Sequence, residues 1–357
     1  TGINNLVHKP GRSVTEFFDW NVIKGIFKLD VFNPIKKHIQ KHFKHPYLRQ
    51  LMEFPVLFLG ALPENTPALY SLMNYADIKL GTWYPQGGMY SVVEAMYKLA
   101  LELGVNFQFN ENVKQIEVEN NSATKIVTDK GEYKTDVIIS GADYHFTEMN
   151  LLEEKYRSYS EKYWDKKIMA PSCLMYYVGL NKKLRNMQYH SLFFDVPFDK
   201  HADEIYTTKQ WPSDPLFYVS VNSVTDSTVA PPGGEAIVFL IPVAAGLEND
   251  TEELRDKYFQ QIVKRMEQHT GEQILNFIVY KKTYAVSDFV DDYNSYRGNA
   301  YGLANTLMQT AIFKPGCKSK KLNNLYYTGQ LTVPGPGVPP CLISGEVVAK
   351  EVQKDFR

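Results

Sequence analysis

The sequence has little cysteine and no excess of charge of one sign. Cysteine occurs three times in 357 residues, at Cys173, Cys317 and Cys341, and no C-x-x-C pair is present. Neither a disulfide framework nor a zinc ribbon is indicated, and a reducing compartment fits best. The 39 Lys and Arg residues nearly balance the 40 Asp and Glu residues, for a net charge of -1. Because a nucleic-acid-binding surface is basic, nucleic acid is not an expected partner.

Long apolar runs are also missing. The longest, Pro55–Leu62 and Ala236–Leu247, are shorter than the roughly 18 residues that a membrane-spanning helix needs. Residues 1–12 are polar and do not resemble a signal peptide. We therefore expect a cytoplasmic protein whose contact with a membrane is peripheral. Aromatic residues make up 13% of the chain, which suits a large apolar ligand but equally a well-filled core.

The spacing of apolar residues changes along the chain. Residues 1–83 read as helices, with two of them expected at Asn33–Phe43 and Pro46–Phe58. A helix then follows Gly88 and ends at Gly104, and turn residues at Asn120-Asn121 and at 129–131 separate short strands. The expected strands are Val105–Phe109, Val113–Glu119, Thr124–Thr128 and Asp136–Ser140.

Further strands predict a second, mostly antiparallel sheet. They are expected at Ser172–Gly179, Leu192–Asp195, Pro215–Val221 and Glu235–Ile241. A helix capped by Asp250 should run to about His269. The chain closes with a strand at Asn324–Gly329, a Gly/Pro-rich loop and a helix from about Cys341 to Lys354. This order predicts two domains that are interleaved in sequence.

The loop between the last strand and the last helix carries the clearest chemical pattern. Its glycines, among them Gly335 and Gly337, let backbone approach a flat or anionic ligand, and the helix that follows directs its positive end to the same place. A rigid turn is the plainer interpretation of these two glycines. Pro340 stands where a dinucleotide fingerprint needs its third glycine, so the loop is not a phosphate-binding turn.

The whole stretch resembles the carboxyl-terminal signature of bacterial carotenoid desaturases, the phytoene desaturase family of FAD-dependent oxidoreductases. The matching residues are Asn324, Leu325, Tyr326, Gly329, Pro334, Gly335, Gly337, Val338 and Pro339. The chain departs from the family at Gln330 and Leu331, where small residues are usual, and at Val333, where His is usual. These departures concern the polarity at the flavin edge.

Two earlier segments extend the resemblance, which runs from about residue 10 to the end. Pro85–Gly88 is similar to the family's Pro-x-Gly-Gly stretch near the flavin, and Asp136–Asp143 is similar to its adenine-side strand. The resemblance implies FAD as the cofactor and a set of residues that contact it. These residues are Gly87, Gly88, Val113, Gly141, Ala142, Gly329, Gln330, Pro334, Gly335, Gly337 and Val338.

The family begins with a strand, a G-x-G-x-x-G turn and a helix that hold the FAD pyrophosphate, and no such start is present here. We therefore expect an α/β fold in which an incomplete, Rossmann-like FAD-binding domain is interleaved with a substrate domain of antiparallel sheet and helices, as in amine oxidases and phytoene desaturases. The expected ranges are a helical, membrane-facing part at 1–83, FAD-binding segments at 84–150 and 318–357, and a substrate domain at 151–317.

The activity that the resemblance implies is desaturation of phytoene or of a later carotene such as γ-carotene, with electrons passing to a quinone or oxygen. A flavin that accepts a hydride leaves an allylic cation, and loss of a proton then completes the double bond, so few polar catalytic residues are needed. Two alternatives stay open. One is another flavoenzyme on the same scaffold, such as a carotene isomerase, a polyene saturase or an amine oxidase. The other is a non-catalytic fragment that binds only lipid or a partner.

Few polar residues stand out as catalytic. Asp143 is a weak candidate for holding or moving a proton, with helix capping as its alternative, and Glu346 is expected to complement a helix dipole. Cys341 stands near a helix start, where a thiol pKa can fall, although an inert core residue is the simpler interpretation. His38, His42 and His45 share a helix face without a completing carboxylate, so no metal site is expected.

A basic helix precedes an apolar segment, and together they suggest a lipid-facing entrance. The helix carries Lys36, Lys37, Lys41 and Lys44, which can lie on anionic headgroups. The segment 51–62 follows it, and we expect Phe54, Phe58 and Leu62 near a substrate tunnel. The alternatives are a solvated helix and an ordinary core helix.

Overall fold

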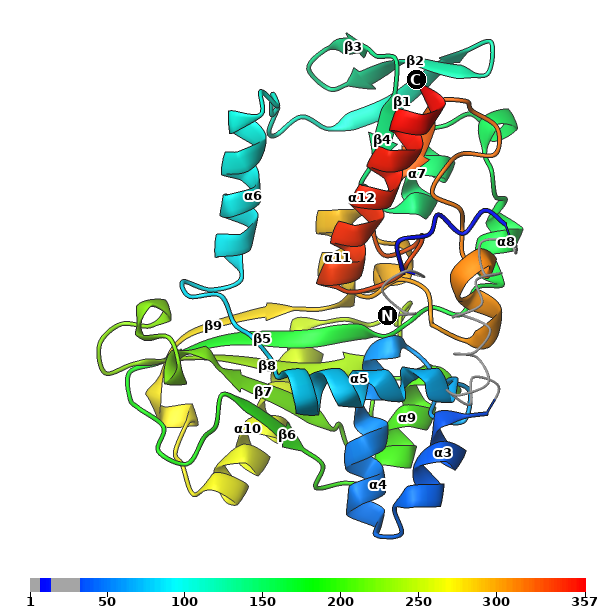
Figure 1. Ribbon diagram of the computed structural model, residues 1–357. Helices are drawn as coiled ribbons and strands as arrows, with labels where there is room; N and C mark the ends of the chain where they lie inside the picture. The colour runs from blue at the N-terminus through cyan, green and yellow to red at the C-terminus, as the bar shows by residue number, and fades with distance from the viewer. Residues whose placement is uncertain (1–6, 14–32) are drawn as a thin grey trace. The chain divides into compact units, whose positions relative to one another are not determined.

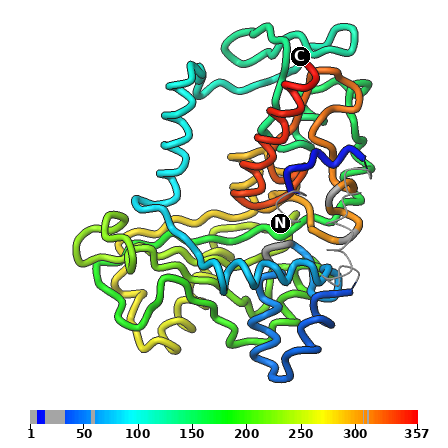
Figure 2. The backbone as a smooth tube through the Cα atoms, in the orientation of Figure 1, coloured from blue at the N-terminus to red at the C-terminus, as the bar shows by residue number. Residues whose placement is uncertain are grey.

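The structure is a computed structural model that describes residues 7–13 and 33–357, apart from the side chains of residues 57–59, 307 and 311. It divides into two compact units (Figure 1). Unit 1 contains residues 1–79, 110–171 and 290–357, and unit 2 contains residues 80–109 and 172–289. The backbone therefore passes between the units more than once (Figure 2), as the interleaved order of elements predicts. This division follows packing and differs from the expected ranges, because residues 1–79 pack with the carboxyl-terminal segment. The functional ranges stay a prediction.

From residue 33 on, the first elements of unit 1 are a pair of short helices that lie side by side (Figure 1), α3 (Ile35–His42) and α4 (Pro46–Glu53). The predicted second helix stops earlier than expected, because Pro55 lacks the N–H that an α-helix needs and a 3₁₀ helix, η2 (Phe54–Leu59), takes over. The chain continues through η3 (Ala68–Ser71), α5 (Leu72–Tyr75) and the π-helical turn η4 (Ala76–Leu80), at whose last residue unit 2 begins. The part of the predicted helical segment before residue 33 lies largely outside the described residues.

The middle segment of unit 1 is an antiparallel meander of β1 (Val113–Glu119), β2 (Ser122–Thr128) and β3 (Glu132–Lys134). The predicted turn at Asn120-Asn121 joins the first two strands, and both residues adopt positive φ, as a tight hairpin turn requires. The strand β4 (Ile138–Ser140) follows, and it pairs in parallel with β10 (Leu325–Tyr327). Two segments almost 190 residues apart thus form one sheet, which confirms the expected return of the chain.

Helices surround these strands within unit 1. They are α7 (Tyr144–Asn150), η5 (Glu154–Tyr156), α8 (Glu161–Asp165) and α12 (Val338–Asp355), with the short 3₁₀ turns η9 (Tyr296–Gly298), η10 (Leu307–Gln309) and η11 (Ala311–Phe313). Tyr144 stacks on Tyr327 with ring centroids 3.6 Å apart, and Trp164 is fully buried beside them. The carboxyl-terminal strand is therefore held by an aromatic core.

Unit 2 is built on a five-stranded antiparallel sheet with the order β6-β7-β8-β5-β9. The strands are β5 (Ser172–Leu180), β6 (His190–Phe193), β7 (Phe217–Val221), β8 (Glu235–Val243) and β9 (Ile278–Tyr284). The four predicted strands are confirmed within a few residues. The fifth, β9, was not predicted, because Lys281 and Lys282 interrupt its apolar pattern at an edge of the sheet.

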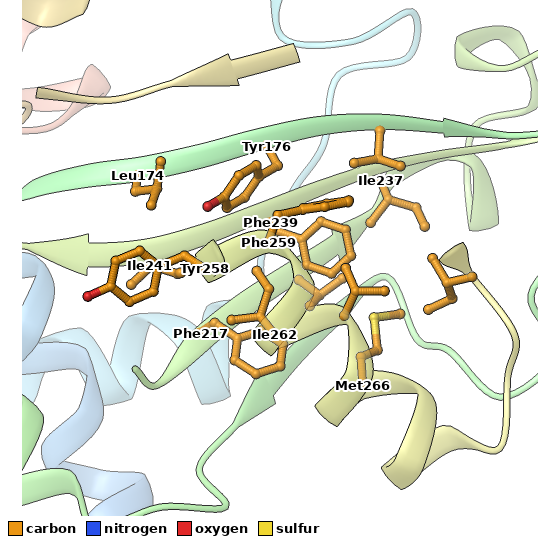
Figure 3. Close-up of a cluster of buried hydrophobic side chains, with 14 of the residues drawn as sticks. Leu174, Tyr176, Phe217, Ile237, Phe239, Ile241, Tyr258, Phe259, Ile262 and Met266 are labelled. Carbon is orange, nitrogen blue, oxygen red and sulfur yellow. The ribbon is translucent and has the colours of Figure 1, made fainter. Parts of the chain in front are cut away.

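One face of this sheet packs against α10 (Glu252–Thr270), whose apolar residues meet those of the strands (Figure 3). Phe259 and Ile262 come from the helix, while Tyr176 and Phe239 come from the neighbouring strands β5 and β8 (Figure 3). Thr251, and not Asp250, caps the helix, because Asp250 pairs with Arg255 instead. Smaller elements complete the unit, namely α9 (Phe198–Tyr206), η6 (Asn222–Val224), η7 (Ser227–Val229), η8 (Leu275–Phe277) and α11 (Val286–Tyr293), whose last four residues belong to unit 1.

The helix α6 (Tyr90–Glu102) carries no buried residue, although its sequence is amphipathic. Val93, Met96 and Leu99, which share its apolar face, are each at least half exposed. The strand expected at Val105–Phe109 is absent, because this segment pairs with no other strand among the described residues.

Candidate functional site

The candidate site lies in unit 1, where β10 leads into the Gly/Pro-rich loop and α12. The parallel pairing of Leu325 with Ile138 and of Tyr327 with Ser140 fixes where the strand ends. Thr328 then donates its N–H to Ser140 O at 2.9 Å, and Gly329 donates its N–H to the Ser344 hydroxyl on α12 at 2.9 Å. The loop between Gly329 and α12 is therefore held at both ends.

Three glycines of this loop adopt backbone angles that other residues rarely take. Gly329 has φ of 103°, Gly335 of 138° and Gly337 of 111°. A Cβ on Gly337 would lie 3.3 Å from the Pro340 ring, whereas a Cβ on Gly329 would meet no atom within 4 Å. Gly329 thus borders open space, and the need for these three glycines is conformational.

Residues that depart from the family pattern anchor the loop. Leu331, Thr332 and Val333 are all buried, and the Thr332 hydroxyl donates to Pro315 O at 2.8 Å. Gly302 packs closely against Gln330, because a Cβ on Gly302 would lie 2.6 Å from Gln330 O. The unusual residues at positions 331 and 333 therefore act as core side chains, and of the three departures only Gln330 stays half exposed.

The final helix starts earlier than predicted. Its N-cap is Gly337 and its first three residues are Val338, Pro339 and Pro340, so Cys341 lies inside the first turn. The two prolines carry no N–H, and the Cys341 N–H already donates to Gly337 O at 2.9 Å. Val338 is left as the one N–H donor of the first three helical residues. The helix keeps its dipole here but offers few hydrogen-bond donors to a ligand.

A lysine that the sequence analysis did not single out lies beneath this loop. Lys314 is only 4% exposed, and its Nζ has no hydrogen-bond partner among the residues that the structure describes. A Cβ on Gly335 would lie 3.2 Å from Lys314 Nζ and 3.6 Å from Asn305 Oδ1. Burial, reinforced by the positive charge of Lys167, lowers the pKa of Lys314 to about 8. An ammonium and an amide therefore converge on one glycine of the predicted site.

The other predicted flavin contacts of unit 1 lie around the same strands. Gly141 and Ala142 follow β4, and a Cβ on Gly141 would lie 3.6 Å from the Thr328 hydroxyl. Val113 begins β1, pairs with Thr128 and packs at the edge of the same hydrophobic core as Leu325. Pro334 follows a cis peptide bond from Val333 and is half-buried. The contact of each of these residues with FAD stays a prediction.

Gly87 and Gly88 belong to unit 2, where an acidic residue fixes their loop. The Gly87 N–H donates to Asp226 Oδ2 at 2.7 Å, and Asp226 also accepts from the Thr228 N–H and hydroxyl. These bonds lower the pKa of Asp226. Both glycines have positive φ, and a Cβ on Gly88 would lie 3.6 Å from the Tyr84 hydroxyl.

The acidic candidates have structural partners. Asp143 caps α7 by accepting from the Phe146 N–H at 3.1 Å, and its second oxygen accepts from the Tyr296 N–H at 3.0 Å. Burial nevertheless raises its pKa. With both oxygens engaged by backbone, the structure favours the capping role over proton transfer. Glu346 lies in the third turn of α12, too far from the helix start to complement the dipole as expected, and it pairs with Lys350 and His8.

The structure also describes Cys341 and the three histidines at positions 38, 42 and 45. Burial raises the pKa of Cys341, contrary to the lowering that a helix start can cause. No cluster of three metal-binding side chains occurs in the described part of the chain. His45 caps α4 by accepting from the Tyr47 N–H, so it does not continue the face of His38 and His42.

The tunnel and membrane residues are only partly described. Phe54 and Leu62 are half-buried, and the side chain of Phe58 lies outside the described residues. Lys36 forms an ion pair with Glu64, while Lys37, Lys41 and Lys44 are exposed. Within residues 7–13 and 33–357, the structure contains no helix long and apolar enough to cross a membrane.

The residues of unit 1 fit an anionic, flat cofactor. Gly329 borders open space, Val338 is 56% exposed at the start of α12, and the buried Lys314 ammonium has no protein partner in the described chain. Gly329 and Val338 would border the flavin, with the Lys314 ammonium behind Gly335, and the flavin would supply the capacity to accept a hydride. The sequence pointed to the glycines but not to Lys314, Gly302 or Asn305, for which only proximity in the fold gives a signal.

Comparison with known proteins agrees with this geometry. The model of the family described as flavin containing amine oxidoreductase matches residues 28–353. The chain is 36% identical over 357 residues to the carotenoid 3,4-desaturase of Haloarcula japonica, covering 100% of this chain and 72% of that protein. It is 26% identical over 371 residues to the phytoene desaturase of Neurospora crassa, covering 99% of this chain and 62% of that protein.

A solved structure, an oxidoreductase from Methanosarcina mazei, matches in fold with a TM-score of 0.62 at 15% identity, over 95% of this chain and 75% of that one. The expected α/β fold, the resemblance to carotenoid desaturases and FAD as the cofactor of an oxidoreductase are thereby confirmed. The chain belongs to the family of flavin-containing amine oxidoreductases.

Proposed function

We propose that this protein catalyses the FAD-dependent desaturation of a carotenoid, with phytoene or a later carotene such as γ-carotene as substrate. The observation that carries the proposal is the 36% identity, over the whole chain, to a carotenoid 3,4-desaturase. Since that relative is longer than the chain, the activity is proposed for the protein that includes any segment needed to hold FAD.

The site supports a reaction that relies on positioning more than on acid–base groups. The polar groups around the loop include the Gly329 N–H, the Ser344 hydroxyl, the Asn305 amide and the Lys314 ammonium. No carboxylate forms an ion pair with Lys314 within the described residues, and Asp143 is engaged as a cap. A hydrocarbon substrate offers nothing to hydrogen-bond, so its binding rests on apolar burial and on exclusion of water.

The test is turnover of carotenes by the FAD-loaded protein in liposomes with a quinone as acceptor, compared with oxygen alone. Each new conjugated double bond moves the absorption of the product to longer wavelength, and chromatography separates substrate from product. We expect conversion of at least one of phytoene and γ-carotene, with loss of conversion when FAD is removed. Absence of product from both carotenes, with FAD bound and either acceptor, would reject the proposal.

The same assay separates the alternatives. A carotene isomerase would change the shape of the spectrum without adding a double bond, and a polyene saturase would shorten the chromophore. An amine oxidase would reduce its flavin with a primary amine and leave it oxidised with a carotene. Binding of carotene without any of these changes would identify a lipid-binding fragment.

Peripheral membrane association completes the proposal, because carotenes dissolve in lipid. On α4, Tyr47 is 75% exposed and Leu51 is 53% exposed, beside the exposed lysines of α3 and of the turn after it. Exposed apolar residues next to basic ones suit the boundary between headgroups and acyl chains. Phe54 and Leu62 follow in the chain, which is why we place the substrate entrance here.

A further inference from the structure

Lys314 is a buried ammonium to which no described residue supplies a counter-charge. Its side chain is almost fully buried, its Nζ has no hydrogen-bond partner in the described chain, and the charge that acts on it, Lys167, has the same sign. Burial of an unpaired ammonium costs on the order of several kcal/mol, so buried ammonium groups are usually paired or bind a ligand. Neighbouring lysines are different. Lys318 pairs with Asp355, and Lys320 lies 4.2 Å from the centre of the Tyr159 ring.

The position of Lys314 links it to the flavin loop. A Cβ on Gly335 would lie 3.2 Å from Lys314 Nζ, so the ammonium occupies the space that any other residue at 335 would need. Asn305 Oδ1 is close to the same point, and Asn305 is itself 6% exposed. The loop therefore has a fixed positive charge directly behind its backbone.

The helix that follows offers few N–H donors to an anion. Pro339 and Pro340 remove two of the N–H groups that the first turn of α12 would direct at an anion. An unneutralised ammonium compensates for this loss, because a full charge in a poorly solvated site acts more strongly on an anion than a helix dipole does.

We propose that Lys314 is a positioning residue for the flavin, and that its ammonium stabilises the anionic reduced flavin relative to the oxidised form. Two-electron reduction with uptake of one proton leaves a negative charge on the ring system, and this charge is the counter-charge that no described residue supplies to Lys314. The proposal rests on the FAD cofactor of the family and not on the identity of the substrate, so a failed carotene assay leaves it intact.

The test compares midpoint potentials of the FAD-bound protein with Lys314→Met, which removes the charge, and with Lys314→Arg, which keeps it. We expect Lys314→Met to bind oxidised FAD but to favour the reduced flavin about tenfold less, which lowers the two-electron potential by about 30 mV. Sulfite, which adds an anion to oxidised flavin, should bind about tenfold more weakly. Lys314→Arg should shift the potential by less than about 9 mV and change the sulfite affinity by less than about twofold.

The matched control is Lys318→Met, which removes the same charge elsewhere in unit 1 and should shift the potential by less than about 9 mV, a twofold change in the redox equilibrium. Equal potentials and equal sulfite affinities in the parent and in Lys314→Met would overturn the proposal. If Lys314→Met does not retain FAD, Lys314→Gln provides the same measurement. Loss of oxidised FAD from both neutral variants, with retention by Lys314→Arg, would assign the charge to the diphosphate and also overturn the proposal.

Discussion

Asn324 and Ala123, 201 residues apart in sequence, exchange two hydrogen bonds. Asn324 Oδ1 accepts from the Ala123 N–H at 2.8 Å, and Asn324 Nδ2 donates to Ala123 O at 2.7 Å. The same Nδ2 donates to Asp136 O at 2.7 Å. The first residue of the Asn-Leu-Tyr motif thus fastens the meander and the segment before β4 to the start of β10, which leads into the flavin loop.

Replacement of Asn324 by Ala should destabilise the protein by about 2–4 kcal/mol, because it leaves the buried Ala123 N–H and two carbonyls without partners. Chemical denaturation measures the change. Asn323→Ala is the control, since the Asn323 side chain is exposed and its backbone N–H, which the substitution keeps, donates to Asn121 O. A loss below about 0.5 kcal/mol is expected for the control, and an equal loss in both variants would show that the side-chain bonds of Asn324 are unimportant.

Gly337→Val should abolish flavin retention. Valine is strained at φ of 111°, and its Cβ would press on the Pro340 ring at 3.3 Å, which displaces the start of α12. Gly335→Val should also abolish flavin retention, because its Cβ would press on Lys314 Nζ at 3.2 Å. Bound flavin per protein after gel filtration is the measurement. Gly345→Ala is the control, because a Cβ there meets no atom within 4 Å in mid-helix, and unchanged flavin content in Gly337→Val would make the loop structural only.

The stability of the FAD-free protein should rise with pH between about 8 and 10.5. The folded pKa of Lys314 is lowered to about 8 from 10.5, so in this window the unfolded chain binds a proton that the folded chain does not. Below about 8 the full cost of burying the charge is present, at most about 3 kcal/mol. Burial also lowers the pKa of Lys167 and raises the pKa of several tyrosines, so these groups add their own pH dependence, and the quantity to measure is the difference between the parent and Lys314→Met.

That difference, obtained from denaturation curves at both ends of the window, should shrink as pH rises, because Lys314→Met has no charge to lose. A difference that is constant with pH would mean that Lys314 does not titrate between these values. Addition of FAD followed by reduction should also shrink the difference near pH 8, since the ammonium then gains a counter-charge.

Charge reversal on α3 and the turn after it should release the protein from anionic vesicles. Lys37, Lys41 and Lys44 are exposed beside Tyr47 and Leu51, and each is expected to contribute about 1 kcal/mol of attraction to an anionic surface. Liposome flotation of the triple Glu variant should show loss of binding to anionic vesicles. Lys36 is left intact, because it pairs with Glu64.

The control for this experiment reverses Lys114, Lys130 and Lys134, three exposed lysines in and between strands of the meander, with the same change in net charge. The control should float like the parent. Equal flotation of all three proteins would remove the membrane contact from the proposed function, while leaving desaturation untouched.

The sequence by itself determined the elements whose signals are local. Asn120-Asn121 predicts a tight turn because both residues tolerate positive φ, and the strand–loop–helix at the carboxyl terminus follows from its glycines and prolines. The family follows from the same stretch, since Asn324, Gly329, Gly335 and Gly337 occur there in a fixed order. Alternation of apolar residues was enough to predict β5 and β8, two neighbouring strands inside the sheet. Along most of each strand, buried residues alternate with less buried ones.

The tertiary structure alone decided which polar residues matter. Lys314 stands close to Lys318, Lys320 and Lys321 in sequence, and nothing local sets it apart. It differs because the segments around Asn305 and Gly335 close over it, which removes water and partners from one ammonium but leaves Lys318 paired and Lys321 exposed. For Asp143 the structure reduced the functional interest. It is a helix cap and not a candidate acid, because the Phe146 and Tyr296 N–H groups donate to its two oxygens. Burial and pairing are properties of contacts between distant segments, so periodicity and spacing along the chain do not contain them.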